Sequence, residues 1–103
     1  MAPLEVPVVR ERGLALLASP DSHPGYMAMV PEGSEWPNRV PARTLLQVLR
    51  YHPGREARGL RIPTLLVVAE GDALCPPRAT LRMARKLPSS RAVGLPMGHF
   101  GPY

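Results

Sequence analysis

The stretch "IPTLLVVAEGDALCPP", residues 62–77, decides how this chain folds. Its first half, residues 62–69, is a continuous apolar run rather than an alternating one. Such a run is typical of a strand in a parallel sheet that is covered on both faces. The run stops at an acidic turn that contains Asp72, and two prolines follow, of which Pro77 suits the first position of a helix. The stretch therefore predicts a strand, a turn that carries a carboxylate, and a helix.

The residues that follow complete a βαβ unit. The helix expected at about residues 77–87 has an apolar face and an opposite, solvated face with a stripe of arginines. A second short strand is expected at about residues 91–96. Because strands joined by such a crossover run parallel, their ends meet at one edge of the sheet. Asp72 follows the first strand and His99 follows the second, so a hydrogen bond between them is geometrically feasible.

The first 60 residues predict a different arrangement. Two short apolar runs, residues 6–9 and 14–18, flank a charged turn that ends in Gly13, and together they predict a β-hairpin. Residues 19–38 alternate turn formers with isolated bulky side chains, which indicates a cap-like loop with about one helical turn, suited to a lid or a pocket wall. An amphipathic helix is expected at residues 41–51, and a polar, basic connector follows it.

Length and composition bound the choices further. A chain of 103 residues has room for one small core, which will be aliphatic because there are only one Phe, one Trp and three Tyr. We expect a single, incomplete α/β domain, in which residues 1–60 form the hairpin and cap-proximal region and residues 61–103 form the βαβ unit. The single cysteine, Cys75, excludes an internal disulfide. Neither a secretion leader nor an apolar run of about 18 residues is present, so a cytoplasmic protein without a membrane span is expected.

The net charge of +5 lies wholly in the second half of the chain. A nucleic-acid-binding surface needs gathered basic groups, preferably with aromatic rings that stack on bases. No aromatic residue lies between Tyr51 and Phe100, where the basic excess is found. We therefore expect no nucleic-acid partner.

Asp72 and His99 are the candidate catalytic residues. Taken alone, Asp72 would be an ordinary turn acid, because acids and glycines are common in turns, and His99 would be a surface turn histidine. As a pair, they match the order acid then histidine that closes the Ser…Asp/Glu…His sequence of α/β-hydrolases. In that chemistry the carboxylate fixes the tautomer of the imidazole, and the other ring nitrogen takes the proton from the nucleophile.

Two other chemistries are less favoured. Cys75 beside His99 could be a nucleophile, but a partly buried structural thiol is the better interpretation, because reactive thiols need a helix N-terminus or a cation aimed at them. The histidines and Cys75 show no close metal-ligand spacing along the chain. We therefore expect no metal site and no cofactor.

The sequence resembles a known family over nearly its whole length. Residues 61–103, "RIPTLLVVAEGDALCPPRATLRMARKLPSSRAVGLPMGHFGPY", resemble the C-terminal part of the α/β-hydrolase superfamily, in its branch of bacterial serine esterases and lipases. Residues 16–43, "LLASPDSHPGYMAMVPEGSEWPNRVPAR", are similar to the cap-proximal region of some bacterial members. The patterns "GDALCPP" and "GHF" carry the likeness. It implies that Asp72 is the acid and His99 the base of a Ser-His-Asp triad acting on a small-molecule ester or acyl substrate.

The chain also departs from that family. No serine lies two residues after a glycine, so the nucleophile motif Gly-x-Ser-x-Gly is absent. In similar proteins the sheet has eight strands, and the nucleophile would lie before Met1; a last helix would follow Tyr103. We therefore expect the C-terminal segment of a hydrolase, inactive alone. The rival interpretation is a noncatalytic interaction or dimerisation module that uses an exposed sheet edge.

Overall fold

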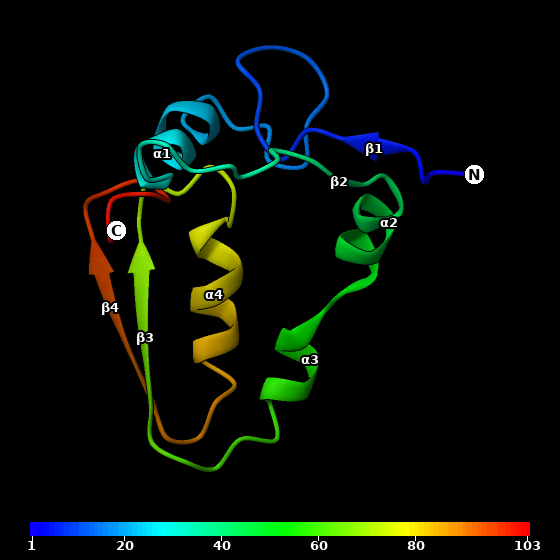
Figure 1. Cartoon of the computed structure of the whole chain (residues 1–103). Helices are drawn as coiled ribbons and strands as arrows, with labels where there is room; N and C mark the ends of the chain where they lie inside the picture. The colour runs from blue at the N-terminus through cyan, green and yellow to red at the C-terminus, as the bar shows by residue number, and fades with distance from the viewer. The chain divides into compact units, whose positions relative to one another are not determined.

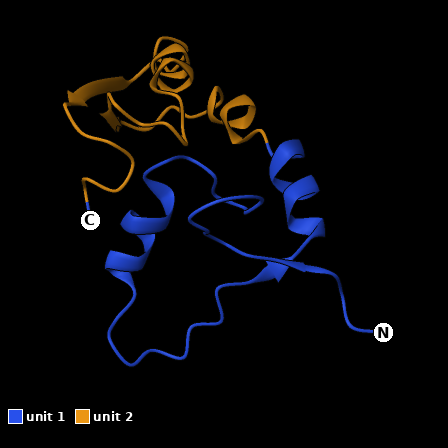
Figure 2. Ribbon diagram, turned by 90° about the horizontal axis from the view of Figure 1, so that it is seen from above, with its two compact units in different colours: residues 1–51, 103 blue, residues 52–102 orange.

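A computed structural model describes all 103 residues as a mixed α/β structure. The chain forms two compact units, one of Met1–Tyr51 with Tyr103 and one of His52–Pro102 (Figure 2). The first unit contains β1 (Glu5–Val6), α1 (Ser22–Met29), β2 (Val40–Pro41) and α2 (Arg43–Arg50). The second contains α3 (Pro53–Ala57), β3 (Thr64–Ala69), α4 (Pro77–Ala84) and β4 (Ser90–Leu95) (Figure 1). None of the helices has the length and apolar character that crossing a membrane requires.

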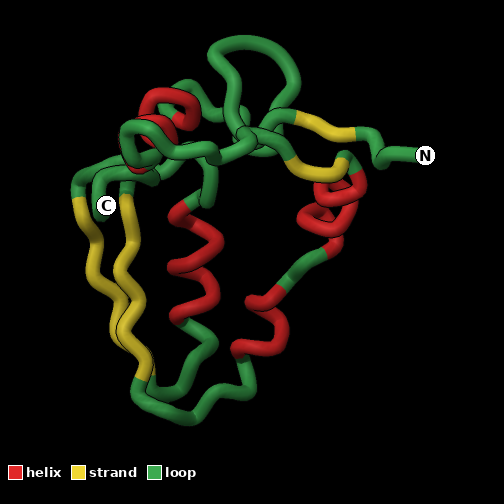
Figure 3. The backbone as a smooth tube through the Cα atoms, in the orientation of Figure 1, coloured by secondary structure: helices red, strands yellow, loops and turns green.

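The second unit is the predicted βαβ unit. β3 and β4 pair in parallel, from Thr64 opposite Ser90 to Ala69 opposite Leu95, and α4 contacts both strands (Figures 1 and 3). The ladder begins one residue after Pro63, because proline has no N–H to donate. α4 begins at Pro77 as predicted but ends at Ala84, and a turn continues to residue 87. Strand, helix and strand are therefore confirmed: β3 and α4 are shorter than expected, and β4 begins and ends one residue earlier than expected.

The sheet is covered on one face only. Val68 of β3 and Leu87 after α4 are buried, with 5% and 6% of their surface exposed. Leu65 and Val67, which alternate with the buried positions along β3, are 62% and 55% exposed. The expectation of cover on both faces is wrong for this chain, because a single crossover helix can cover only one side of a two-stranded sheet.

The predicted β-hairpin of residues 6–18 does not form. β1 pairs instead with β2 in an antiparallel ladder, and the second apolar run meets the first in a parallel bridge between Val9 and Leu17. A remote side chain explains the difference: the Asn38 Oδ1 atom accepts hydrogen bonds from the Val8 and Val9 N–H groups, and Asn38 Nδ2 donates to the Val9 carbonyl. Val9 is fully buried, so these hydrogen bonds with the Asn38 side-chain amide hold the backbone at the centre of the first unit's core.

Two segments are more helical than expected. The predicted cap-like loop contains α1, two turns long, because Pro24 falls in the first turn, where its missing N–H costs no helical hydrogen bond. The predicted connector contains α3, because Pro53 ends the preceding helical segment but also starts a new helix at its first position. The helix expected at residues 41–51 is confirmed as α2.

Candidate active site

Asp72 and His99 meet at the carboxyl end of the parallel sheet. The His99 Nδ1 atom lies 2.8 Å from Asp72 Oδ2. The two loops that carry them are joined by a hydrogen bond from the Gly71 N–H to the Met97 carbonyl, at 3.0 Å. A Cβ atom at position 71 would lie 3.2 Å from the Met97 carbonyl oxygen, so glycine permits this close approach. The parallel register therefore produces the pairing that the sequence suggested was feasible.

The Asp72 carboxylate is held by its own loop. Its Oδ1 atom accepts hydrogen bonds from the backbone N–H groups of Leu74, at 2.8 Å, and Cys75, at 2.7 Å, which leaves Oδ2 for His99. Its side chain is 10% exposed. Burial by itself raises the pKa of Asp72, but the hydrogen bonds from Cys75, His99 and Leu74 outweigh it and hold the pKa below its usual value. Asp72 is thus a fixed anion at neutral pH.

The fixed anion determines the tautomer of His99. An ionised carboxylate can only accept hydrogen bonds, so Nδ1 of His99 must carry a proton and donate it to Asp72. The Nε2 atom binds no protein group, and no buried polar side-chain atom in the structure lacks a partner, so Nε2 reaches solvent. The imidazole and the Phe100 ring form an edge-to-face pair, with ring centroids 4.9 Å apart and planes at 74°. When the ring is neutral, Nε2 offers a free lone pair to an approaching hydroxyl.

Cys75 lies in the same cluster but does not form the predicted structural thiol. By its surface area the residue is exposed rather than partly buried. One ligand-type atom from each of Asp72, Cys75 and His99 lies within 4.8 Å of the others. Desolvation by neighbouring atoms, and then the nearby Asp72 charge, raise the pKa of the thiol. Spacing along the chain predicted no group of metal-ligating residues. It could not predict the grouping of these three side chains, because His99 lies in the loop after the next strand.

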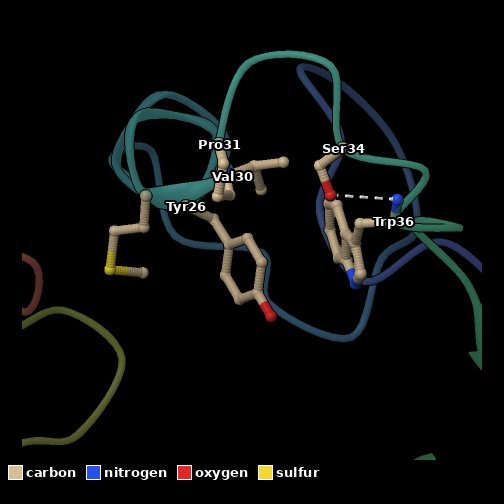
Figure 4. Close-up of a pocket in the computed structure, with 6 residues that line it drawn as sticks. Tyr26, Val30, Pro31, Ser34 and Trp36 are labelled. Carbon is tan, nitrogen blue, oxygen red and sulfur yellow. Dashed lines mark hydrogen bonds between the residues drawn. The ribbon is translucent and has the colours of Figure 1, made fainter.

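The first unit contains a separate apolar hollow (Figure 4). Tyr26 and Trp36 stack with ring centroids 4.8 Å apart, and the Trp36 backbone N–H donates to the Ser34 hydroxyl oxygen. The hollow has a volume of about 320 Å³ and is lined by Tyr26, Met29, Val30, Pro31, Ser34 and Trp36. The segment predicted as a lid or pocket wall therefore does line a pocket within its own unit.

The chain is similar in sequence to part of a known protein. The chain is similar to the quorum-quenching protein AidA of Acinetobacter baumannii, with 38% identity over 102 residues. The aligned region is 98% of this chain and 34% of AidA, so the chain spans about a third of the length of that relative. No protein-family model matches the chain, and no solved structure matches it. The chain is thus a partial homologue of a bacterial quorum-quenching protein.

Proposed function

We propose that this chain supplies the acid and the base of a Ser-His-Asp triad in a protein of the α/β-hydrolase type. The observation that carries the proposal is the 2.8 Å hydrogen bond from His99 Nδ1 to a carboxylate that is itself fixed by two backbone donors. The parallel βαβ unit supports it, because acid and histidine follow successive parallel strands, as in that superfamily.

The geometry suits proton transfer in both directions. Nε2 of neutral His99 takes the proton of a nucleophilic hydroxyl as that oxygen attacks an acyl carbon. The resulting imidazolium keeps its Nδ1–H bond to Asp72, whose negative charge stabilises it. The same proton is then delivered from Nε2 to the leaving group. The nucleophile itself is not in a Gly-x-Ser-x-Gly motif of these 103 residues, so the proposal assigns it to another polypeptide segment.

The proposed substrate is a small-molecule ester or related acyl compound. The hollow of the first unit is largely hydrophobic and aromatic, with the Tyr26 and Ser34 hydroxyls among its polar side-chain groups, and such a lining is typical of a site for an apolar small molecule. Quorum quenching, the activity in the name of AidA, supplies a functional assay for the same proposal.

A chimera tests the proposal. The region of AidA that aligns with this chain is replaced by the chain, and nitrophenyl ester hydrolysis and quorum quenching are measured. The chimera should be active, and His99→Ala should lower its kcat about a thousand-fold or more, the usual cost of losing a triad base. His52→Ala, an exposed histidine outside the cluster, is the matched control and should leave kcat unchanged. An active chimera that tolerates His99→Ala would contradict the assignment.

A second candidate function is a noncatalytic interaction module. The exposed side chains of Leu65 and Val67 favour this function. It is also favoured by the sheet, in which β3 pairs only with β4 and therefore has one open edge. Light scattering of the purified chain discriminates: a stable dimer that becomes monomeric in Val67→Lys supports this function, and a monodisperse monomer over a wide concentration range counts against it.

A further inference from the structure

We propose that Asp72, Cys75 and His99 form a binding site for a thiophilic divalent cation of the Zn²⁺ class, and that the bound ion prevents His99 from acting as a base. The binding is a property of these three side chains. Only its effect on catalysis rests on the proposed function.

The three side chains offer ligand types that Zn²⁺ accepts, namely a carboxylate oxygen, a thiolate sulfur and an imidazole nitrogen. In a tetrahedral site with bonds of about 2.0 to 2.3 Å, neighbouring ligand atoms lie about 3.3 to 3.6 Å apart. The cluster atoms already lie within 4.8 Å of one another. Cys75 is exposed, so a rotation of its side chain can supply most of the remaining movement. Three protein ligands leave a fourth position for water, as in many zinc sites.

The charges and protons also balance. An Asp72 carboxylate and a Cys75 thiolate together neutralise the two charges of the ion. Binding releases the thiol proton of Cys75 to solvent, so one proton leaves for each ion bound.

The ion and the hydrogen bond compete for the same nitrogen. The imidazole faces Asp72 through Nδ1, so an ion shared with this carboxylate must bind Nδ1 and displace its proton. That proton moves to Nε2, the only other basic atom of the ring. An imidazole protonated at Nε2 and bound to a metal at Nδ1 has no lone pair for a nucleophile's proton. Occupancy therefore excludes the base function by changing the tautomer.

Titration of the reduced, purified chain tests the binding without any measurement of activity. Calorimetry with Zn²⁺ should give one ion per chain, with heats in different buffers reporting one released proton. With Co²⁺ as the probe, thiolate-to-metal absorption should appear, and it must come from Cys75 because the chain has no other cysteine. On Zn²⁺ addition the His99 Nδ1 resonance in ¹⁵N spectra should shift, while those of His23 and His52 should not.

Variants separate this site from an isolated thiol. Cys75→Ser should abolish the cobalt absorption, and His99→Ala and Asp72→Asn should each weaken Zn²⁺ binding at least about ten-fold, whereas His23→Ala should not. Zn²⁺ that binds with unchanged affinity in His99→Ala, that leaves the His99 resonance unmoved, or that binds at half an ion per chain with dimerisation would overturn the proposal. So would the absence of saturable binding. An inactive chimera would refute the proposed function but leave these results unaffected.

Discussion

Replacing Asp72 by asparagine should reverse the tautomer of His99 without disrupting the loop. The amide oxygen of Asn can still accept the hydrogen bonds of the Leu74 and Cys75 N–H groups. Its NH₂ group, however, replaces the oxygen that faces His99 Nδ1, so two donors would meet. The neutral imidazole avoids this by carrying its proton on Nε2. The base would then present an N–H, instead of a lone pair, to the nucleophile.

The size of the effect follows from the contact that is lost. A hydrogen bond to a charged group contributes about 1.5 to 3 kcal/mol. Because 26% of the His99 side chain and 10% of the Asp72 side chain are exposed, we take the lower part of that range. A loss of about 1.5 to 2 kcal/mol changes the ratio of the two tautomers about 13- to 30-fold. Asp72→Ala removes the acceptor without adding a donor, so it should shift the ratio less, and it should also destabilise the loop because both backbone donors lose their acceptor.

Long-range ¹H–¹⁵N spectra of the imidazole nitrogens measure this ratio directly. At a pH where the ring is neutral, His99 should carry its proton mainly on Nδ1 in the parent chain and mainly on Nε2 in Asp72→Asn. The exposed His52 provides the control and should not change. A parent chain with the proton on Nε2, or an Asp72→Asn ratio equal to that of the parent, would refute the reasoning.

Three further predictions concern stability. Val9→Ala should lower the free energy of unfolding of the first unit by about 1 to 3 kcal/mol, because Val9 is fully buried. Urea titration followed by Trp36 fluorescence measures this loss, and a loss below a few tenths of a kcal/mol would contradict the placement of Val9 in the core. Gly101→Ala should lower the free energy of unfolding by about 1 kcal/mol or more, because its Cβ would lie 2.7 Å from Met97 Cβ. Gly94→Ala should be nearly neutral, because the exposed Glu70 side chain that it would overlap can move. Urea unfolding followed by circular dichroism measures both, and equal midpoints for the two variants would contradict this prediction. The lowered pKa of Asp72 contributes stability above the ordinary carboxyl pKa of about 3.9, and this contribution is lost as pH falls through the lower folded-state pKa. The parent chain should therefore be more stable than Asp72→Ala by its full margin at pH 7, and the margin should shrink on acidification. A difference in stability that stays constant with pH would be inconsistent with this prediction.

The βαβ unit could be predicted because its signals are local. A continuous apolar run, a proline at the first helical position and a second short apolar run each specify an element without reference to distant residues. The rule that crossover-linked strands run parallel then brings Asp72 and His99 into one neighbourhood. What remained hidden was the support of the acid by the backbone of Leu74 and Cys75, because loop conformation is not encoded in a residue-type pattern.

The errors have a common physical cause, which is competition from partners distant in sequence. The hairpin fails because the Asn38 side chain occupies the backbone groups of Val8 and Val9, and nothing near those residues announces it. The metal-ligand grouping of Cys75 with Asp72 and His99 was missed because ligand spacing along the chain does not detect residues that come from different loops.

The most direct test of the central claim, that Asp72 and His99 activate a nucleophile carried elsewhere, is the intact mass of protein treated with a fluorophosphonate, which labels activated serines. We predict that this chain alone remains unlabelled, and that the chimera with AidA gains one label on the AidA portion and loses it in His99→Ala. Labelling of the isolated chain, or equal labelling of the chimera with and without His99, would contradict the account.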